Sequence, residues 1–84
     1  MFYVYVLRSK NDGMLYTGFS ADLKRRFAAH NEGKVESTKT RRPFELLYYE
    51  ACRQQPDALR REKYLKTTYG HRYLKSRLRT DLDV

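Results

Sequence analysis

The residues best suited to chemistry lie in residues 16–30. Leu23, Arg26, Phe27 and His30 recur at i, i+3, i+4 and i+7, which puts them on one face of a helix. Leu23 and Phe27 are the expected core anchors. Arg26 and His30 then lie one turn apart at the margin of the buried stripe. A cation and a titratable imidazole aimed at one point indicate an anion site.

A strand end and a tight turn are predicted to lead into this helix. Gly18 permits the turn because a residue without a Cβ reaches backbone angles that are closed to others. Ser20 is the expected N-cap, and Asp22 in the first turn suits the positive end of the helix dipole. Gly33 is the expected C-terminal cap.

A β-hairpin is predicted ahead of the turn. Residues 2–7 alternate in the manner of a strand, residues 11–13 (Asn-Asp-Gly) are a hairpin signal, and residues 14–17 return as a second strand. In a tight hairpin, Tyr5 lies opposite or nearly opposite Tyr16. Facing phenols are also compatible with plain cross-strand packing, which the spacing alone favours.

A polar segment and a third strand are expected after the first helix. Residues 34–42 predict a mobile basic loop, in which Lys39, Arg41 and Arg42 contact phosphates or belong to a solvated connector. Residues 44–51 predict a strand whose apolar centre suits coverage on both faces.

A second helix is predicted to open at residues 55–57. Ala58, Glu62 and Leu65 follow at i, i+4 and i+7, so a carboxylate lies on the apolar stripe. Such a group costs free energy unless it meets a cation, a metal or hydrogen-bond donors. Two interpretations stay open, a metal ligand and a salt bridge to a neighbouring arginine. The other charged side chains of the helix are expected to face solvent: Arg60, Arg61 and Lys63.

A third, basic helix is predicted over residues 71–79, after a break at residues 67–70. Leu74 and Leu78 are its expected anchors.

Length and charge bound the function. Eighty-four residues make one small domain, and a net charge of +8 points to a polyanionic partner, nucleic acid first and an anionic membrane second. The single cysteine, Cys52, excludes an internal disulfide and fits a reducing compartment, so we expect a cytoplasmic protein. The spacing of Cys and His excludes an ordinary zinc site, and no apolar run reaches the length of a membrane span.

The motifs resemble those of the GIY-YIG nuclease superfamily in its small single-domain form. Residues 3–5 (Tyr-Val-Tyr) resemble the first signature and residues 16–18 (Tyr-Thr-Gly) the second. Residues 23–30 carry an Arg and a His at the family's positions, and residues 58–66 resemble its acidic helix. The resemblance covers nearly the whole chain. Tyr3 and Thr17 depart from the signatures at positions that supply no catalytic group.

The resemblance implies an α+β fold for residues 1–84, with a three-stranded antiparallel sheet flanked by helices in a ββαβα core plus a C-terminal helix. It implies cleavage of phosphodiesters with one divalent ion, Mg²⁺ or Mn²⁺. Tyr5 would be the general base and Tyr16 would assist it. Arg26 would stabilise the developing charge, His30 would hydrogen-bond the site, and Glu62 would hold the metal. Because a free phenol has a pKa of about 10, a cation and a metal are needed beside Tyr5.

The sequence therefore predicts a metal-dependent endonuclease that acts on DNA by backbone and structure, with DNA repair as the expected setting. With no second domain in these residues, a protein partner could supply specificity. The alternatives are an inactive nucleic-acid-binding module of the same fold and a basic RNA-associated protein.

Overall fold

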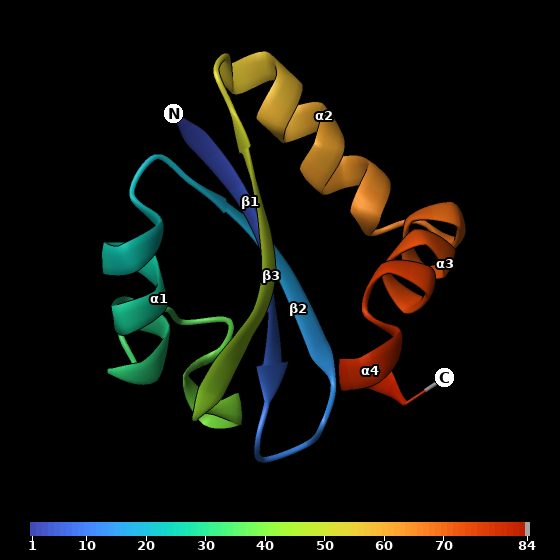
Figure 1. The fold of residues 1–84 in the computed structure, drawn as a ribbon. Coiled ribbons are helices and arrows are strands. Elements are labelled where there is room, and N and C mark those ends of the chain that lie inside the picture. The colour runs from blue at the N-terminus through green and yellow to red at the C-terminus, as the bar shows by residue number, and fades with distance from the viewer. Residues whose placement is uncertain (84) are drawn as a thin grey trace.

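The central strand of the sheet is β1 (Phe2–Ser9) in a computed structural model that describes residues 1–83. It pairs antiparallel with β2 (Leu15–Ser20) on one side and with β3 (Phe44–Cys52) on the other. Helix α1 (Leu23–Asn31) covers one face of the sheet (Figure 1). The opposite face carries α2 (Gln55–Leu65), α3 (Thr68–Arg77) and the short α4 (Arg79–Leu82). A 3-10 turn, η1 (Lys39–Arg41), precedes β3. The predicted α+β fold is confirmed.

Alternation along β1 builds a separate apolar core on each face. Val4 and Val6 are fully buried against α2 and α3, where the core is completed by Ala58, Leu65, Leu74 and Leu78. Tyr5 and Leu7 point to the other face, where Leu23 and Phe27 of α1 pack against them. The predicted helix anchors are therefore confirmed, and α1 is held by the same layer that contains Tyr5.

Strand β3 is an edge strand, and the prediction that both its faces are covered is wrong. Leu46 is 36% exposed and Tyr49 is 52% exposed. Both side chains belong to the face that α1 covers, but α1 leaves this edge open. The apolar run in the sequence marked a strand correctly, yet it could not show which strand takes the centre of the sheet.

Two caps fix the ends of α1. Asp22 is the N-cap and accepts from the backbone N–H of Arg25 (3.1 Å), so the prediction that Ser20 caps the helix is wrong. Ser20 instead accepts from the N–H of Asp22 and shapes the turn before it (2.9 Å). Gly33 follows the last turn at φ +76° and donates to the carbonyl of His30 (3.3 Å), as predicted for a residue that ends a helix.

Helix α3 starts earlier than predicted. The Thr67 side chain caps it by accepting from the N–H of Gly70 (3.2 Å). The predicted break is therefore limited to Lys66 and Thr67, and residues 68–70 already belong to α3. A Cβ on Gly70 would lie 2.2 Å from the carbonyl oxygen of Tyr64. Gly70 therefore permits the close approach of α3 to the end of α2.

Arg61 ties α2 to the sheet, although it was expected to face solvent. Its Nε donates to the Glu50 carboxylate on β3 (2.9 Å), and its guanidinium lies 4.6 Å from the ring centroid of Tyr73 on α3. Tyr48 joins the network by donating to Glu50 (2.7 Å). This network fixes the rotation of α2 about its axis, and with it the direction of the neighbouring Glu62.

The helices of residues 1–83 are short. The longest, α2, has 11 residues, and none of the helices described combines the length and apolar character needed to cross a membrane. Cys52 at the end of β3 is a free, half-buried thiol.

Candidate active site

Tyr5 occupies the middle of the central strand, directly opposite Gly18 of β2. Its ring lies across Gly18, because a Cβ at that position would come within 2.4 Å of the Tyr5 hydroxyl oxygen. Gly18 lies inside β2, so its use is space for the phenol and not the turn that the sequence indicated. Tyr16 pairs with Leu7, two residues further along the ladder, and its ring centroid lies 6.4 Å from that of Tyr5.

His30 is the direct partner of the Tyr5 hydroxyl. The side chain of His30 is fully buried, and its Nε2 lies 2.8 Å from the Tyr5 hydroxyl oxygen. Its Nδ1 lies 2.8 Å from Oγ1 of Thr38, a buried hydroxyl that donates to the carbonyl of Val35. In the tautomer with the proton on Nδ1, Nδ1–H donates to Thr38, and the Thr38 hydroxyl keeps its long hydrogen bond (3.4 Å) to the Val35 carbonyl. His30 Nε2 is then the acceptor, and the Tyr5 hydroxyl donates to it.

This burial corrects the picture of Arg26 and His30 as a matched pair at the helix margin. Arg26 is exposed, whereas His30 is inside the protein. Burial, helped by the positive charge of Arg26, lowers the pKa of His30 to about 4. The imidazole is therefore neutral at pH 7, and it acts as a hydrogen-bond acceptor for Tyr5 and not as a cation for an anion.

The low pKa of His30 predicts acid sensitivity. Between pH 6.5 and about 4 the unfolded chain protonates this histidine while the folded protein does not. Stability should fall as the pH drops through that window, by on the order of 3 kcal/mol, and this contribution should level off below it. Urea unfolding at several pH values measures the loss. His30→Gln should remove that part of the slope, and the matched variant His71→Gln, which changes an exposed histidine on α3, should keep it. An unchanged slope in His30→Gln would contradict the assignment.

The Tyr5 hydroxyl is the point where the charges of the site meet. Burial raises the pKa of Tyr5 above its ordinary value, and the neighbouring Tyr16 and Glu62 raise it further. The Arg26 guanidinium acts in the opposite direction and lowers it, which is the second-largest influence after burial. The net shift is upward, so the phenol keeps its proton at neutral pH.

Glu62 comes to this point from the other face of the sheet. Its helix, α2, packs against β1 and β2 opposite to α1, so the five predicted groups do not share one face. The Tyr5 ring lies over β2, which is an edge strand of the sheet. The two faces of the sheet meet along the free edge of this strand. The Glu62 side chain is 22% exposed and pairs with Lys66 (3.2 Å). The arginine partner that the sequence suggested is absent among the described residues, and a lysine one turn later takes its place.

A cleft of about 510 Å³ borders this edge. It runs between β2 and the α2–α3 junction, and Tyr16, Lys66 and His71 are among the residues that line it. Two basic side chains, Lys66 and His71, therefore line the cleft beside β2, and Lys66 is also the partner of Glu62. Tyr16 is the one site residue that lines the cleft; Tyr5, His30 and Glu62 do not line it.

The basic loop is ordered by its own contacts. Arg41 forms an ion pair with Asp12 (2.7 Å), donates to the carbonyl of Met14 (3.2 Å) and lies over the Phe44 ring. Its hydrogen bonds lower the pKa of Asp12 to about 2. Arg41 is thus a tie between the hairpin loop and η1, in place of the free phosphate contact that the sequence suggested.

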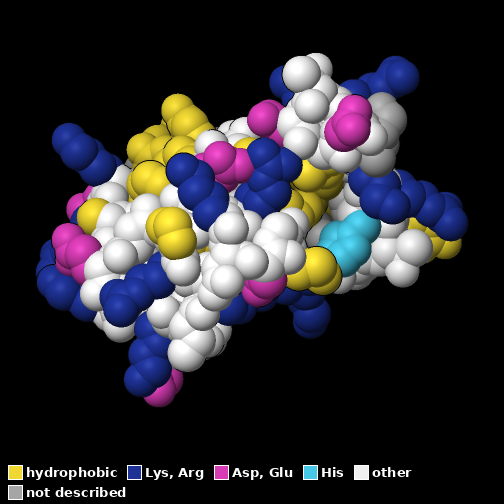
Figure 2. Space-filling view, turned by 90° about the horizontal axis from the view of Figure 1, so that it is seen from below, with side chains coloured by type: hydrophobic (Ala, Val, Ile, Leu, Met, Phe, Trp, Pro, Cys, Tyr) yellow, Lys and Arg dark blue, Asp and Glu magenta, His cyan; other side chains and the backbone are white. Residues whose placement is uncertain are grey.

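Two further basic residues of the loop remain available to solvent. Lys39 pairs with the exposed Glu36 (3.1 Å), and Arg42 is exposed with its guanidinium against Gly33. Figure 2 shows Lys and Arg side chains spread over the face seen from below, with acidic side chains among them. The positive charge is therefore distributed, and no single loop carries it.

The side chains near the site suit a divalent ion that prefers oxygen ligands. Residues 1–83 hold no cluster of three or more His, Cys, Asp or Glu side chains at metal-binding distance, which argues against a protein-enclosed zinc site. Glu62 is a single, partly exposed carboxylate whose charge acts on the Tyr5 hydroxyl. That arrangement fits Mg²⁺ or Mn²⁺, because Mg²⁺ keeps several waters and needs only one or two carboxylates plus substrate phosphate.

Sequence reasoning missed Thr38, Lys66 and the steric role of Gly18. Thr38 lies in a segment that reads as a polar loop, and nothing in its neighbours marks a buried hydroxyl. Lys66 follows Glu62 at i+4, a spacing that does signal an ion pair on a helix.

Comparisons with known proteins point to one family. Residues 1–75 match the sequence profile described as "GIY-YIG catalytic domain". A UPF0213 protein of Staphylococcus saprophyticus is 40% identical over 74 residues, covering 87% of this chain and 89% of the relative. One of Streptococcus agalactiae is 46% identical over 65 residues, covering 76% and 73%. The solution NMR structure of a UPF0213 protein from Bacillus halodurans aligns with a TM-score of 0.56 at 36% identity, over 90% of this chain and 84% of that chain.

Proposed function

Because this chain belongs to the GIY-YIG family, we propose that it is a metal-dependent endonuclease that cleaves DNA by recognising backbone and structure. The observation that carries the proposal is the environment of the Tyr5 hydroxyl. It donates to a buried, neutral histidine and lies within the electrostatic influence of Arg26, Tyr16 and Glu62. A binding module has no need of a proton acceptor behind a buried phenol.

The pair of Tyr5 and His30 would activate water. As water attacks the phosphorus, its proton would pass to the Tyr5 oxygen while the Tyr5 proton passes to Nε2 of His30. The P–O bond to the leaving nucleotide breaks, and the departing oxygen takes a proton from solvent water. Tyr5 ends neutral. The imidazole becomes a cation, and its Nδ1–H keeps its hydrogen bond to Thr38 Oγ1. A bound phosphate brings negative charge that favours the imidazolium and raises the proton affinity of His30. This relay avoids the cost of a free phenolate at neutral pH.

The remaining groups would bind and orient. Arg26 would stabilise the negative charge that develops on the phosphorane oxygens, and Tyr16 would hold the attacking water beside Tyr5. Glu62 would hold Mg²⁺ or Mn²⁺, which supplies positive charge to a phosphate oxygen when it is bound.

Backbone recognition predicts a uniform effect of Arg42→Ala. Arg42 is exposed and makes no ion pair among the described residues, so its loss should weaken binding to every nucleic acid about equally. The slope of log affinity against log salt should fall by about 1. Fluorescence anisotropy in EDTA over a range of salt measures both, with Arg53→Ala, an exposed arginine after β3, as the matched control. A loss confined to one sequence would contradict backbone recognition.

The activity itself is tested by incubating the pure protein with linear, nicked, flapped and branched DNAs and with RNA. Each substrate is assayed with Mg²⁺, with Mn²⁺ and with EDTA. We expect cleavage of DNA only with a metal, and branched forms before linear duplex. Binding without cleavage of any substrate in either metal would favour the inactive module, and cleavage or selective binding of RNA alone would favour the RNA-associated alternative.

A further inference from the structure

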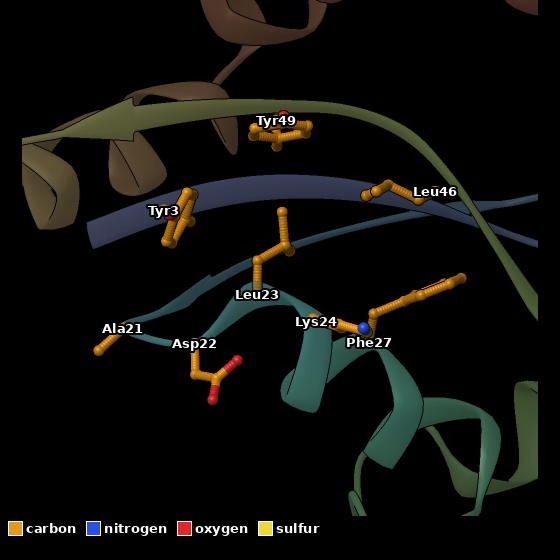
Figure 3. Close-up of a pocket in the computed structure, with 8 residues that line it drawn as sticks. All are labelled: Tyr3, Ala21, Asp22, Leu23, Lys24, Phe27, Leu46 and Tyr49. Carbon is orange, nitrogen blue, oxygen red and sulfur yellow. The ribbon is translucent and has the colours of Figure 1, made fainter. Parts of the chain in front are cut away.

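An apolar groove lies on the α1 face of the sheet, on the side of α1 away from β2. It has a volume of about 500 Å³, within the range of small-ligand sites. Leu23 and Phe27 project into it from α1, and Tyr3, Leu46 and Tyr49 face them from the strands (Figure 3). None of these side chains takes part in the hydrogen bonds around Tyr5 described above.

Two tyrosines give the groove a shape that suits a flat ring. The centroids of Tyr3 and Tyr49 are 6.1 Å apart with the rings inclined by 62°, so they form a corner. Tyr49 is half exposed and presents part of its ring to the open groove. An aromatic ligand can stack on one ring and meet the other edge-on, which is the favoured geometry for such contacts.

The charged side chains that line the groove complement a nucleotide. Lys24 offers a cation for a phosphate, and the exposed Asp22 can accept from an exocyclic amino group. The net charge of +8 favours a polyanion over a second copy of this chain, which would bring the same charge to the interface. The net charge, together with Asp22 and Lys24 in the lining, argues for a nucleotide over a purely apolar ligand.

The groove lies next to the candidate active site along the sheet. Tyr49 is the cross-strand partner of Tyr5, and Tyr3 lies two residues before Tyr5 on the same face of β1. Those spacings are about 5 Å across the sheet and about 7 Å along the strand. The Tyr5 ring leans toward β2 while Tyr49 lies on β3, so one strand could pass a base into the groove next to the phosphate at Tyr5.

We propose that this groove binds an unpaired nucleobase adjacent to the phosphate that is cleaved, and so selects nucleic acids with single-stranded nucleotides at the cleavage point. The inference rests on the proposed nuclease function and names its substrate class. A base stacked inside a duplex cannot enter, whereas a base in a flap, gap or loop reaches the groove without the cost of unpairing.

The test measures binding without cleavage. Anisotropy in EDTA gives the affinities for a duplex and for the same duplex carrying a short unpaired flap. Tyr49→Ala should weaken flap binding about tenfold and change duplex binding by less than about twofold. Tyr49→Phe keeps the aromatic face and should bind as the wild type does. Tyr69→Ala, which removes a 68% exposed tyrosine on the opposite face of the sheet, is the matched control and should change neither affinity.

Three results would overturn the proposal. The first is an equal loss of affinity for flap and duplex in Tyr49→Ala, and the second is no loss of affinity for either. The third is a dimer in sedimentation velocity that dissociates in Tyr49→Ala, which would assign the groove to a second copy. Cleavage of the flapped duplex with Mg²⁺ is measured on the same preparations. If Tyr49→Ala binds the flapped duplex normally and cleavage persists, the proposed base site is wrong and the nuclease function stands. If flap binding depends on Tyr49 but neither the wild type nor any variant cleaves, the proposed nuclease function is wrong and the base site stands.

Discussion

Glu62→Gln should lower the rate of metal-dependent cleavage by about two to three orders of magnitude. The amide keeps the shape of the side chain but loses the negative charge that would hold the cation. DNA binding in EDTA should hold or improve, because an acidic group near the phosphates is gone. Stability should change little, since the ion pair with the 55% exposed Lys66 side chain is worth only about 0.3–0.5 kcal/mol. Single-turnover cleavage, anisotropy and thermal melting on one preparation measure the three quantities.

Lys66→Ala is the matched control for this variant. It breaks the same ion pair and leaves the carboxylate in place. Cleavage by Lys66→Ala should therefore stay far above that of Glu62→Gln, although Lys66 lines the cleft at β2 and its loss can weaken substrate binding. Normal cleavage with a lowered melting temperature in Glu62→Gln would end the assignment of this residue as the metal ligand.

Tyr5→Phe should have the second large effect, a loss of cleavage rate of about 10²–10⁴-fold, the range of a general base. The phenyl ring still fits over Gly18, so the site keeps its shape. The variant should also be less stable by about 1–3 kcal/mol, because Nε2 of the buried His30 loses its donor. Binding in EDTA should be unchanged, and urea unfolding gives the change in stability.

Tyr73→Phe separates the two consequences. It removes a partly buried hydroxyl that lies 3.0 Å from that of Tyr48, on the other face of the sheet. It should lower stability without slowing cleavage at temperatures where the protein is folded. A Tyr5→Phe protein that cleaves at the wild-type rate would remove the proposed relay, whatever its stability.

The sequence predicted the layer in which the site lies and much less of its hydrogen bonding. Alternation in residues 2–7 placed Tyr5 and Leu7 on one face, and helical spacing placed Leu23 and Phe27 against them. Both patterns are local and survive in the fold. The depth of His30 is set by the packing of Phe44 and Tyr16 around its ring, which come from two different strands. No local pattern carries that information.

Long-range contacts also explain the other differences. Gly18 reads as a turn residue from its neighbours, and only the cross-strand register reveals the phenol above it. The apolar run of β3 is typical of a central strand, but β1 takes that place because it pairs on both sides. Arg61 reads as a solvated residue on its helix, and only the sheet supplies its partner Glu50.

The central claim is that Tyr5 and Glu62 belong to one metal-dependent site, and Mn²⁺ titration followed by NMR tests it most directly. Paramagnetic broadening depends on distance from the ion and needs no cleavage. In the presence of a single-stranded DNA, we predict that the first signals to broaden are those of Glu62 and of Tyr5, Tyr16 and Gly18 across the sheet edge. Glu62→Gln should abolish this pattern. Broadening centred on other acidic residues, or a pattern unchanged in Glu62→Gln, would contradict the account.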